Sequence, residues 1–376
     1  MNRREFLRAS LLAGTGVLAG PMINRGRYNL FADTRSEHSA RAVELVGRSM
    51  VIDMLGLLTL DWPKLYAWQR DPGAFGVSDL QKLRSSGVRV FHPAVDPNDP
   101  RAYDAALDWM AGWDRLLTRR ADSFLRIEGA RDLEQVRTGS KLGILVGFQS
   151  SDHFRTTDDV AHFYGMGQRV SQLTYNARNR LGCGCLEAQD TGLTEFGAQV
   201  VTAMNRAGMV VDISHCSERT SLDAVAVSSK PVLVTHSNCR ALVANPRCKS
   251  DTVLRALASR GGVMGITAVA AFVSPRRWAT VNDLLDHFDH VARTVGIEHV
   301  GIGSDVDVDA ADPATGRPLA RYAVQGLDPA RRVFDLAEGL VRRGYTDRAI
   351  ELILGGNFQR VLGEIWAAPG KVMEGT

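Results

Sequence analysis

The stretch MVVDISHCSERTSLDAVAVSSKPVLVTHSN, residues 209–238, decides the fold that we predict for this chain. Two apolar runs rich in β-branched residues each lead into a histidine, His215 and His236. The segment between them, 218–228, has a helical pattern, with Ser217 as its expected N-cap. A strand–helix–strand unit of this length is typical of a right-handed βαβ crossover, whose two strands point the same way. We therefore expect both histidines at the same edge of a parallel sheet.

Two imidazoles side by side at strand ends indicate a metal site. Neutral imidazole is the commonest nitrogen ligand of zinc, and the matching positions of His215 and His236 favour a shared ion. The alternative is that each is a hydrogen-bonded core histidine. Cys216 and Cys239 stand beside the pair and are conceivable auxiliary ligands. Because the five cysteines lack a paired CxxC spacing, we interpret them as small buried thiols.

The rest of the chain repeats this alternation of strand-like and helix-like segments. Its 376 residues are 45% hydrophobic and 23% charged, the composition of a globular protein with a large core. Several amphipathic segments end in a glycine suited to a left-handed cap, namely Gly87, Gly208, Gly261 and Gly296. Apolar runs typical of buried parallel strands fall at 50–55, 88–92, 142–148, 170–175, 209–215, 232–236, 262–267 and 299–305. Eight such runs separated by helices predict an α/β fold, a (β/α)8 TIM barrel.

Chemistry in such a barrel sits at the carboxyl ends of the strands. Metal-competent side chains gather there in this sequence. In strand order the ends carry Asp53, His92, Gln149, Tyr175 with Asn176, His215, His236, the unremarkable Thr267, and Asp305 with Asp307. This gathering at one rim predicts a metal site there.

The amino terminus predicts export. A basic head that contains Arg3 and Arg4 precedes a small, uncharged apolar run too short to span a bilayer. It is similar to the twin-arginine signal of bacteria, so we expect a periplasmic protein. We predict a signal at 1–20, a polar tether at 21–40 and a single barrel domain at 41–376. No second apolar stretch is long enough to cross a membrane, so we expect a protein that does not span one.

Charge excludes one class of partner. The formal net charge is +3, and no basic stripe is interleaved with aromatic residues, so we do not expect nucleic acid binding.

Taken together, the motifs resemble the membrane (renal) dipeptidase family of zinc peptidases. The resemblance runs from about Val51 to Leu362. The segments that carry it are Gln172-Leu-Thr-Tyr-Asn176, Asp190-x-Gly192-Leu193-Thr194, Asn205-x-x-Gly208-Met-x-Val-Asp212-x-Ser214-His215, His236-Ser237-Asn238 with Pro246-Arg247, His299-Val-Gly-Ile-Gly-Ser-Asp305-x-Asp307 and Leu354-Gly355-Gly356-Asn357-Phe358-x-Arg360.

The resemblance implies a (β/α)8 barrel that hydrolyses dipeptides with two zinc ions bridged by a carboxylate. It implies that His215 and His236 bind one metal and that Asp305 lies at the other and handles protons. It also implies that Arg247 holds the free carboxylate of the substrate, a task that suits the arginine fork. We place Asn238 beside Arg247 among the substrate-binding candidates. Members of the family often form dimers, which leaves a homodimer as an option.

Several positions depart from the family pattern. The His-x-Asp that ends the family's first strand reads Leu55-Gly56-Leu57 here, and the bridging glutamate is Gln149. The histidine that steadies the oxyanion is Tyr175, whose phenol can donate a hydrogen bond but cannot be cationic. Two neighbouring dications need negative ligands between them, so we expect one zinc ion at most, or none.

The third ligand stays open between Asp305, Gln149, Asp53 and, less favoured, His92. The first hypothesis is a single-metal hydrolase that cleaves dipeptides or small N-acyl amino acids, with Asp305 as general base and Tyr175 supporting the oxyanion. The alternative is a dipeptidase-like barrel that has lost peptidase activity and binds or modifies exported peptide-like metabolites. A purely structural scaffold is the third and weakest option.

Overall fold

The computed structural model describes residues 27–28, 37–97, 100–309 and 319–367. The chain separates into two units, Met1–Ala40 and Arg41–Thr376. In the first unit, β1 (Arg27–Tyr28) pairs antiparallel with β2 (His38–Ser39). The predicted export signal at 1–20 and most of the predicted tether lie outside the described residues. No helix in the described ranges has the length and apolar character needed to cross a membrane.

All eight predicted strands are present in the second unit, and each is shorter than its apolar run. Four of them are single strands, and four are broken into an inner and an outer piece. They are β3 (Ile52–Asp53) with β4 (Gly56–Leu57), β5 (Val90–Phe91) with β6 (Ala94–Val95), β8 (Leu142–Ile144) with β9 (Gly147–Phe148), β10 (Val170–Gln172), β11 (Val210–Asp212), β12 (Val234–Ser237), β13 (Met264–Ile266), and β15 (Val300–Ile302) with β16 (Val306–Asp307). The sequence did not predict β7 (Phe124–Arg126), β14 (Ala279–Thr280) or β17 (Val324–Gln325).

The order of neighbouring strands confirms the predicted fold class. One parallel sheet runs β12-β13-β15-β3-β5-β8-β7, and a second runs β11-β10-β9-β6. The second sheet continues the first because β6 and β9 extend β5 and β8 along the chain. A parallel bridge between Asp212 and Leu233 then joins β11 to the start of β12, with Ile213 N–H donating to the Leu233 carbonyl at 2.9 Å. The neighbours thus follow the order of an eight-stranded parallel barrel.

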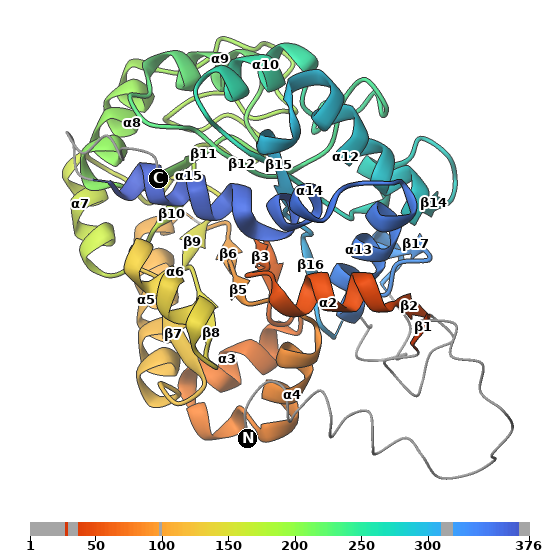
Figure 1. Cartoon of the computed structure of the whole chain (residues 1–376). Helices are drawn as coiled ribbons and strands as arrows, with labels where there is room; N and C mark the ends of the chain where they lie inside the picture. Colours follow the sequence, from red (N-terminus) through yellow and green to blue (C-terminus); the bar gives the residue numbers. More distant parts are fainter. Residues whose placement is uncertain (1–26, 29–36, 98–99, 310–318, 368–376) are drawn as a thin grey trace, which may run out of the picture. The chain divides into compact units, whose positions relative to one another are not determined.

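Helices lie on the outside of these strands, as Figure 1 shows for α5 to α10 and α12. The helices are α2 (Ala40–Arg48), α3 (Trp62–Arg70), α4 (Val77–Ser85), α5 (Ala102–Arg119), α6 (Ala130–Thr138), α7 (Asp158–Gly165), α8 (Glu195–Ala207), α9 (Glu218–Val227), α10 (Asp251–Ser259), α11 (Ala270–Val273), α12 (Val281–Val295), α13 (Arg332–Arg342), α14 (Asp347–Glu351) and α15 (Asn357–Trp366). Ser217 caps α9 as predicted, because its hydroxyl accepts the Thr220 N–H. The four predicted capping glycines all have positive φ, from 76 to 106°.

Close backbone contact in the barrel interior depends on glycine. A Cβ atom at Gly303 would lie 1.8 Å from the carbonyl oxygen of Thr235, so any side chain there would displace one of the two strands. Thr235 lies on β12 and Gly303 follows β15 directly. The absence of a side chain therefore sets how near the end of β15 lies to β12.

A buried ion pair anchors the first strand. Asp53, at the end of β3, accepts from Arg332 of α13, and both side chains have no exposed surface. The Ser304 hydroxyl and backbone N–H also donate to Asp53, at 2.5 and 2.8 Å. The carboxylate thus ties the first strand, the last strand and a late helix together.

Candidate active site

The two histidines of the βαβ unit come together at the carboxyl ends of β11 and β12. Their Nε2 atoms lie 3.0 Å apart, with the rings inclined at 56°. His215 is 7% exposed and His236 is 1% exposed. Burial is the main cause that lowers the pKa of both imidazoles, and the nearby Arg247 guanidinium lowers it further. Both rings are therefore held neutral, the form that binds a metal.

Hydrogen bonds orient the ring of His236 from the barrel interior. Its Nδ1 lies 2.8 Å from the Thr235 hydroxyl oxygen. That hydroxyl lies 2.6 Å from Oδ2 of Asp212, which is buried at the end of β11. The Ser214 hydroxyl lies 2.6 Å from Oδ1 of the same carboxylate. One carboxylate therefore organises the ends of both histidine-bearing strands.

His215 is held from the neighbouring strand end. Its Nδ1 lies 2.7 Å from Oδ1 of Asn176, and its ring stacks on Tyr175 with centroids 4.2 Å apart. Asn176 has φ 55°, an uncommon left-handed conformation that asparagine tolerates. Gly184 packs against it so closely that a Cβ would lie 2.1 Å from the Asn176 carbonyl carbon. The turn after β10 is thus built to aim the Asn176 side chain at His215.

Arg247 braces the two strand ends from the other side. Its Nη1 donates to the Ser214 carbonyl at 2.6 Å, and its Nη2 donates to the His236 carbonyl at 2.7 Å. The side chain is buried, and its Nε has no hydrogen-bond partner among the described residues. Arg247 therefore has a structural task, and its Nε–H is left for a ligand.

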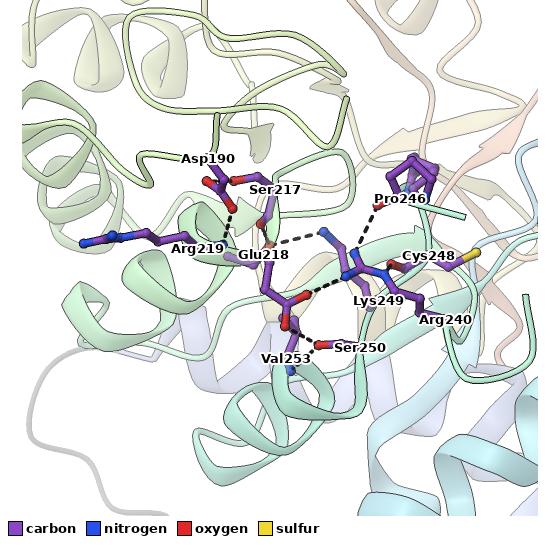
Figure 2. A network of polar contacts seen from close by, with 12 residues as sticks. Asp190, Ser217, Glu218, Arg219, Arg240, Pro246, Cys248, Lys249, Ser250 and Val253 are labelled. Carbon is purple, nitrogen blue, oxygen red and sulfur yellow. Dashed lines mark hydrogen bonds and ion pairs between the residues drawn. The ribbon is translucent and has the colours of Figure 1, made fainter. Parts of the chain in front are cut away.

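The loop that carries Arg247 is tied to the start of α9, as Figure 2 shows. The Glu218 carboxylate accepts from Arg240 at 2.8 Å and from the Ser250 hydroxyl at 2.6 Å. The buried Lys249 ammonium donates to the Cys216 carbonyl at 2.7 Å. Burial lowers the pKa of Lys249 to about 8. Two buried basic side chains thus lie behind the histidine pair.

Asp305 lies at the end of the eighth strand, where its N–H donates to the Leu55 carbonyl at 3.0 Å. Asp305 has φ 57°, and it and Asn176 are the two non-glycine residues with positive φ in the described ranges. Burial raises the pKa of its carboxyl group to about 6, against the pull of Arg321 and Arg247. Burial, followed by the Asp305 charge, also raises the pKa of Tyr175. Asp305 thus shares one electrostatic environment with Tyr175 and Arg247.

The described residues do not assemble a third protein ligand with the histidines. No group of three or more His, Cys, Asp or Glu side chains among them is placed to hold a metal ion. The Gln149 amide nitrogen donates to the Ala94 carbonyl at 3.2 Å. Asp53 is engaged by Arg332 and Ser304, so ligation by it would require those bonds to break. The ligand roles of Asp305, Gln149 and Asp53 stay predictions.

Two further candidates are also held by the backbone. The Asn238 amide donates to the Phe272 carbonyl at 2.9 Å and accepts from the Thr267 N–H at 3.1 Å, and the side chain is fully buried. His92 is bound through Nδ1 to the Leu145 carbonyl at 2.6 Å, and burial lowers its pKa. Both positions brace the barrel; substrate binding by Asn238 stays a prediction.

All five cysteines are reduced and buried, as expected for small buried thiols. Burial raises the pKa of Cys216 to about 11 and moves that of Cys239 higher still. Both groups therefore remain neutral thiols beside the histidines.

The first strand ends in an apolar cluster. Leu55, Leu57 and Ala94 are buried together, with Leu60 packed against them. Asp307 pairs with Leu57 across β16 and β4, and its carboxylate accepts the Leu60 N–H at 2.7 Å. The end of the first strand therefore carries apolar side chains at the two positions where the family pattern has metal ligands.

Comparison with known proteins places this geometry in a family. The family model "Membrane dipeptidase (Peptidase family M19)" matches residues 39–372. The chain belongs to the membrane dipeptidase family. This is a family of zinc-dependent metallopeptidases, and the expectation drawn from the motifs is confirmed.

Several members of the membrane dipeptidase family are similar to the chain. It is 28% identical to Dipeptidase 3 of Mus musculus over 298 residues, which cover 77% of this chain but 58% of the mouse protein. It is 32% identical to an uncharacterized dipeptidase of Schizosaccharomyces pombe over 308 residues, 76% of this chain and 71% of the yeast protein. Among solved structures, an amidohydrolase from Pseudomonas aeruginosa is 27% identical, with a TM-score of 0.74 over 86% of this chain and 99% of that one.

The donor set fits one zinc ion better than the pair used by the family. Two nitrogens bound to one tetrahedral zinc at ~2.0–2.1 Å lie about 3.3 Å apart, close to the observed Nε2 separation. The position at Leu55 and Leu57 offers no ligand side chain and does not fit a second ion. His215 and His236 would therefore be two of the ligands of a metal bound here.

No specific role was predicted from the sequence for four residues of the site, Asn176, Thr235, Asp212 and Lys249. Asn176 and Asp212 stand inside the quoted motifs, so the motifs pointed to them without a function. Thr235 and Lys249 carried no signal beyond their places next to His236 and Arg247.

Proposed function

We propose that this chain is a single-metal hydrolase of the membrane dipeptidase type. It cleaves the amide bond of dipeptides or small N-acyl amino acids. The observation that carries the proposal is the 3.0 Å separation of the His215 and His236 Nε2 atoms, both on buried, neutral rings. When bound there, zinc would supply Lewis-acid polarisation of the scissile carbonyl and an acidified water.

The protein groups around the pair have separate tasks. Asp305 takes the proton of the attacking water, because a carboxylate with a pKa of about 6 is ionised yet basic at neutral pH. Tyr175 remains protonated, since its pKa is raised, and its phenol donates to the developing oxyanion. The Nε–H of Arg247, which has no partner in the described part of the chain, binds the substrate carboxylate.

The test is metal analysis followed by turnover. Protein purified without added metal is assayed for zinc and then against a panel of dipeptides and N-acyl amino acids. We expect about one zinc per chain, and turnover that is lost in His215→Ala and His236→Ala. His162→Ala, at an exposed position on α7, is the control and should keep both. Zinc in the wild type without turnover of any substrate would reject the hydrolase.

Charge favours a second function. Two buried basic side chains, Arg247 and Lys249, lie behind the histidines and disfavour a dication, and they favour an anion. In that case the barrel binds or modifies peptide-like metabolites through their carboxylate and does not hydrolyse them. Calorimetric binding of a dipeptide by metal-free protein, abolished in a dipeptide amide, would support this alternative.

We also propose export to the periplasm by the twin-arginine route, on the basis of Arg3 and Arg4 before the short apolar run. Cell fractionation of the wild type and of the double variant Arg3→Lys, Arg4→Lys tests this. The wild type should be recovered in the periplasm, and the variant should remain in the cytoplasm.

A further inference from the structure

We infer that Asn176 and the Thr235–Asp212 pair are positioning residues that fix the tautomers of both site histidines. They hold the proton of each ring on Nδ1, so that both Nε2 lone pairs point at one cation. The inference rests on the proposed single-metal site. It concerns how this chain prepares the histidines, independently of which amide is cleaved.

The chain of donors leading to His236 has one consistent direction. Asp212 is acceptor-only as a carboxylate, and it also receives the Ser214 and Thr235 backbone N–H groups at 2.9 and 3.0 Å. The Thr235 hydroxyl has one proton, and its 2.6 Å contact with Asp212 uses it. The Thr235 oxygen must then accept from His236, which places the ring proton on Nδ1 and leaves Nε2 as a lone pair.

The Ser214 hydroxyl is another group near the Thr235 hydroxyl that could change the direction of its hydrogen bonds. It lies 3.1 Å from the Thr235 hydroxyl, where either oxygen could donate. However, the Ser214 hydroxyl donates its single proton to Asp212 at 2.6 Å, and its oxygen accepts the His236 backbone N–H at 3.1 Å. No proton remains for Thr235 to receive from Ser214, so the direction toward His236 is unchanged.

Asn176 acts on His215 in the same sense. Its Oδ1 lies 2.7 Å from Nδ1 of His215 and also receives the Cys185 thiol at 3.4 Å. An amide oxygen only accepts, so His215 carries its proton on Nδ1. Its Nε2 is then a lone pair as well.

The two lone pairs face each other across 3.0 Å. Two neutral acceptors at this distance repel, and a cation placed against both converts the repulsion into attraction. A hydrogen bond between the rings would instead need one of them to carry its proton on Nε2. The tautomers therefore distinguish a metal-binding pair from a pair of core histidines bonded to each other.

The experiment measures tautomers and metal affinity, not turnover. Long-range proton–nitrogen NMR spectra of ¹⁵N-histidine-labelled, metal-free protein should show both site histidines protonated at Nδ1. Calorimetric titration with Zn²⁺ and Co²⁺ then compares Thr235→Val, which keeps the shape and removes the hydroxyl, with Thr235→Ser, which keeps it. We expect the valine variant to bind both ions ~10–100-fold more weakly and to lose the Nδ1–H preference of His236. The serine variant should behave as the wild type.

A second pair of variants tests the other histidine and covers the case in which the valine variant fails to fold. Asn176→Gly tolerates φ 55° and removes the amide, whereas Asn176→Asp keeps an acceptor. Only the glycine variant should shift the tautomer of His215 and weaken metal binding. An Nε2-protonated histidine in the wild type, unchanged affinity in the valine and glycine variants, or no binding of Zn²⁺ by the wild type would overturn the inference. Metal binding with the expected tautomers but no amide hydrolysis would overturn the proposed function alone.

Discussion

Arg332 directs Nε and Nη2 at the same oxygen of Asp53, at 3.0 and 2.9 Å, and neither side chain reaches solvent. The two residues are 279 positions apart in the chain. The pair ties helix α13 to the first strand, β3. Because Asp53 is bound to Arg332, its carboxylate is not available as a metal ligand unless this ion pair breaks.

Breaking this pair should be costly. Arg332→Met leaves the Asp53 charge buried without a counterion, and such a loss costs about 3–5 kcal/mol. Urea unfolding measures the change. Arg137→Met is the control, because its ion pair with Glu134 is about half exposed at both ends and should leave the midpoint unchanged. Equal midpoints for wild type and Arg332→Met would contradict this account of Asp53.

Asp305 should make the metal-free protein less stable as the pH rises. Its folded pKa is raised from 3.8 to about 6, so the folded state binds its proton more tightly than the unfolded state does. The resulting stability is fully present below about pH 4 and is lost as the pH rises through about 6. Asp305→Asn should therefore raise the melting temperature at pH 8 and leave it unchanged near pH 4. A gain of equal size at both pH values would rule out the raised pKa as its cause.

Restoring the family's ligands should restore a second metal. In the triple variant Leu55→His, Leu57→Asp, Gln149→Glu, the first two changes put polar groups into the apolar cluster, at a cost of about 1–3 kcal/mol for each group without a partner. We expect a lowered melting temperature without metal, its recovery on addition of zinc, and two zinc ions per chain in place of one. Gln149→Glu alone is the control and should stay at one. If the metal content of the triple variant does not change, the second metal site depends on more residues than these three.

Arg247→Lys should separate the structural task of this residue from ligand binding. An ammonium cannot reach the Ser214 and His236 carbonyls together, so we expect a loss of about 1–3 kcal/mol in unfolding free energy. For a dipeptide, we expect KM to rise on the order of 10-fold or more, the worth of one hydrogen bond to a charged group. With the dipeptide amide, which lacks the carboxylate, wild type and variant should have similar KM. An equal rise for both substrates would assign Arg247 a structural role only.

The ion pair between Glu218 and Arg240 should matter for loop order more than for stability. Both side chains are 34% exposed, so Glu218→Gln should cost less than about 1 kcal/mol, and less still at high salt. Limited proteolysis should cut the 239–250 loop faster in the variant than in the wild type. Unchanged cleavage would mean that Lys249 and Arg247 hold the loop without this pair.

The fold and the histidine pair could be predicted because their signals are local. Continuous apolar runs marked all eight strands, and one βαβ unit was enough to bring His215 and His236 to the same edge. Helix α11 has four residues, too few turns for a 3.6-residue repeat, so no pattern in the sequence marks it.

The roles of individual polar residues could not be predicted in the same way. Asp53 ends a barrel strand like a ligand, and only its distant partner Arg332 shows why it is there. Arg247 and Asn238 bind backbone carbonyls, which every residue offers and no sequence pattern marks. The Thr235 hydroxyl on β12 orients His236, and it can accept from the ring because it donates its own proton to Asp212 on β11. This dependence between two strands leaves no mark in the sequence.

The close approach of Gly303 to Thr235 gives the site a mutational vulnerability on a strand that carries neither site histidine. The substitution Gly303→Ala would push the backbone of β12 outward and move the imidazole of His236 away from that of His215. Its first symptom should be failure to retain the ion, in a molecule whose ligands are all intact. A substitution at this glycine would then reduce metal binding, although its cause is a changed distance between two backbone segments.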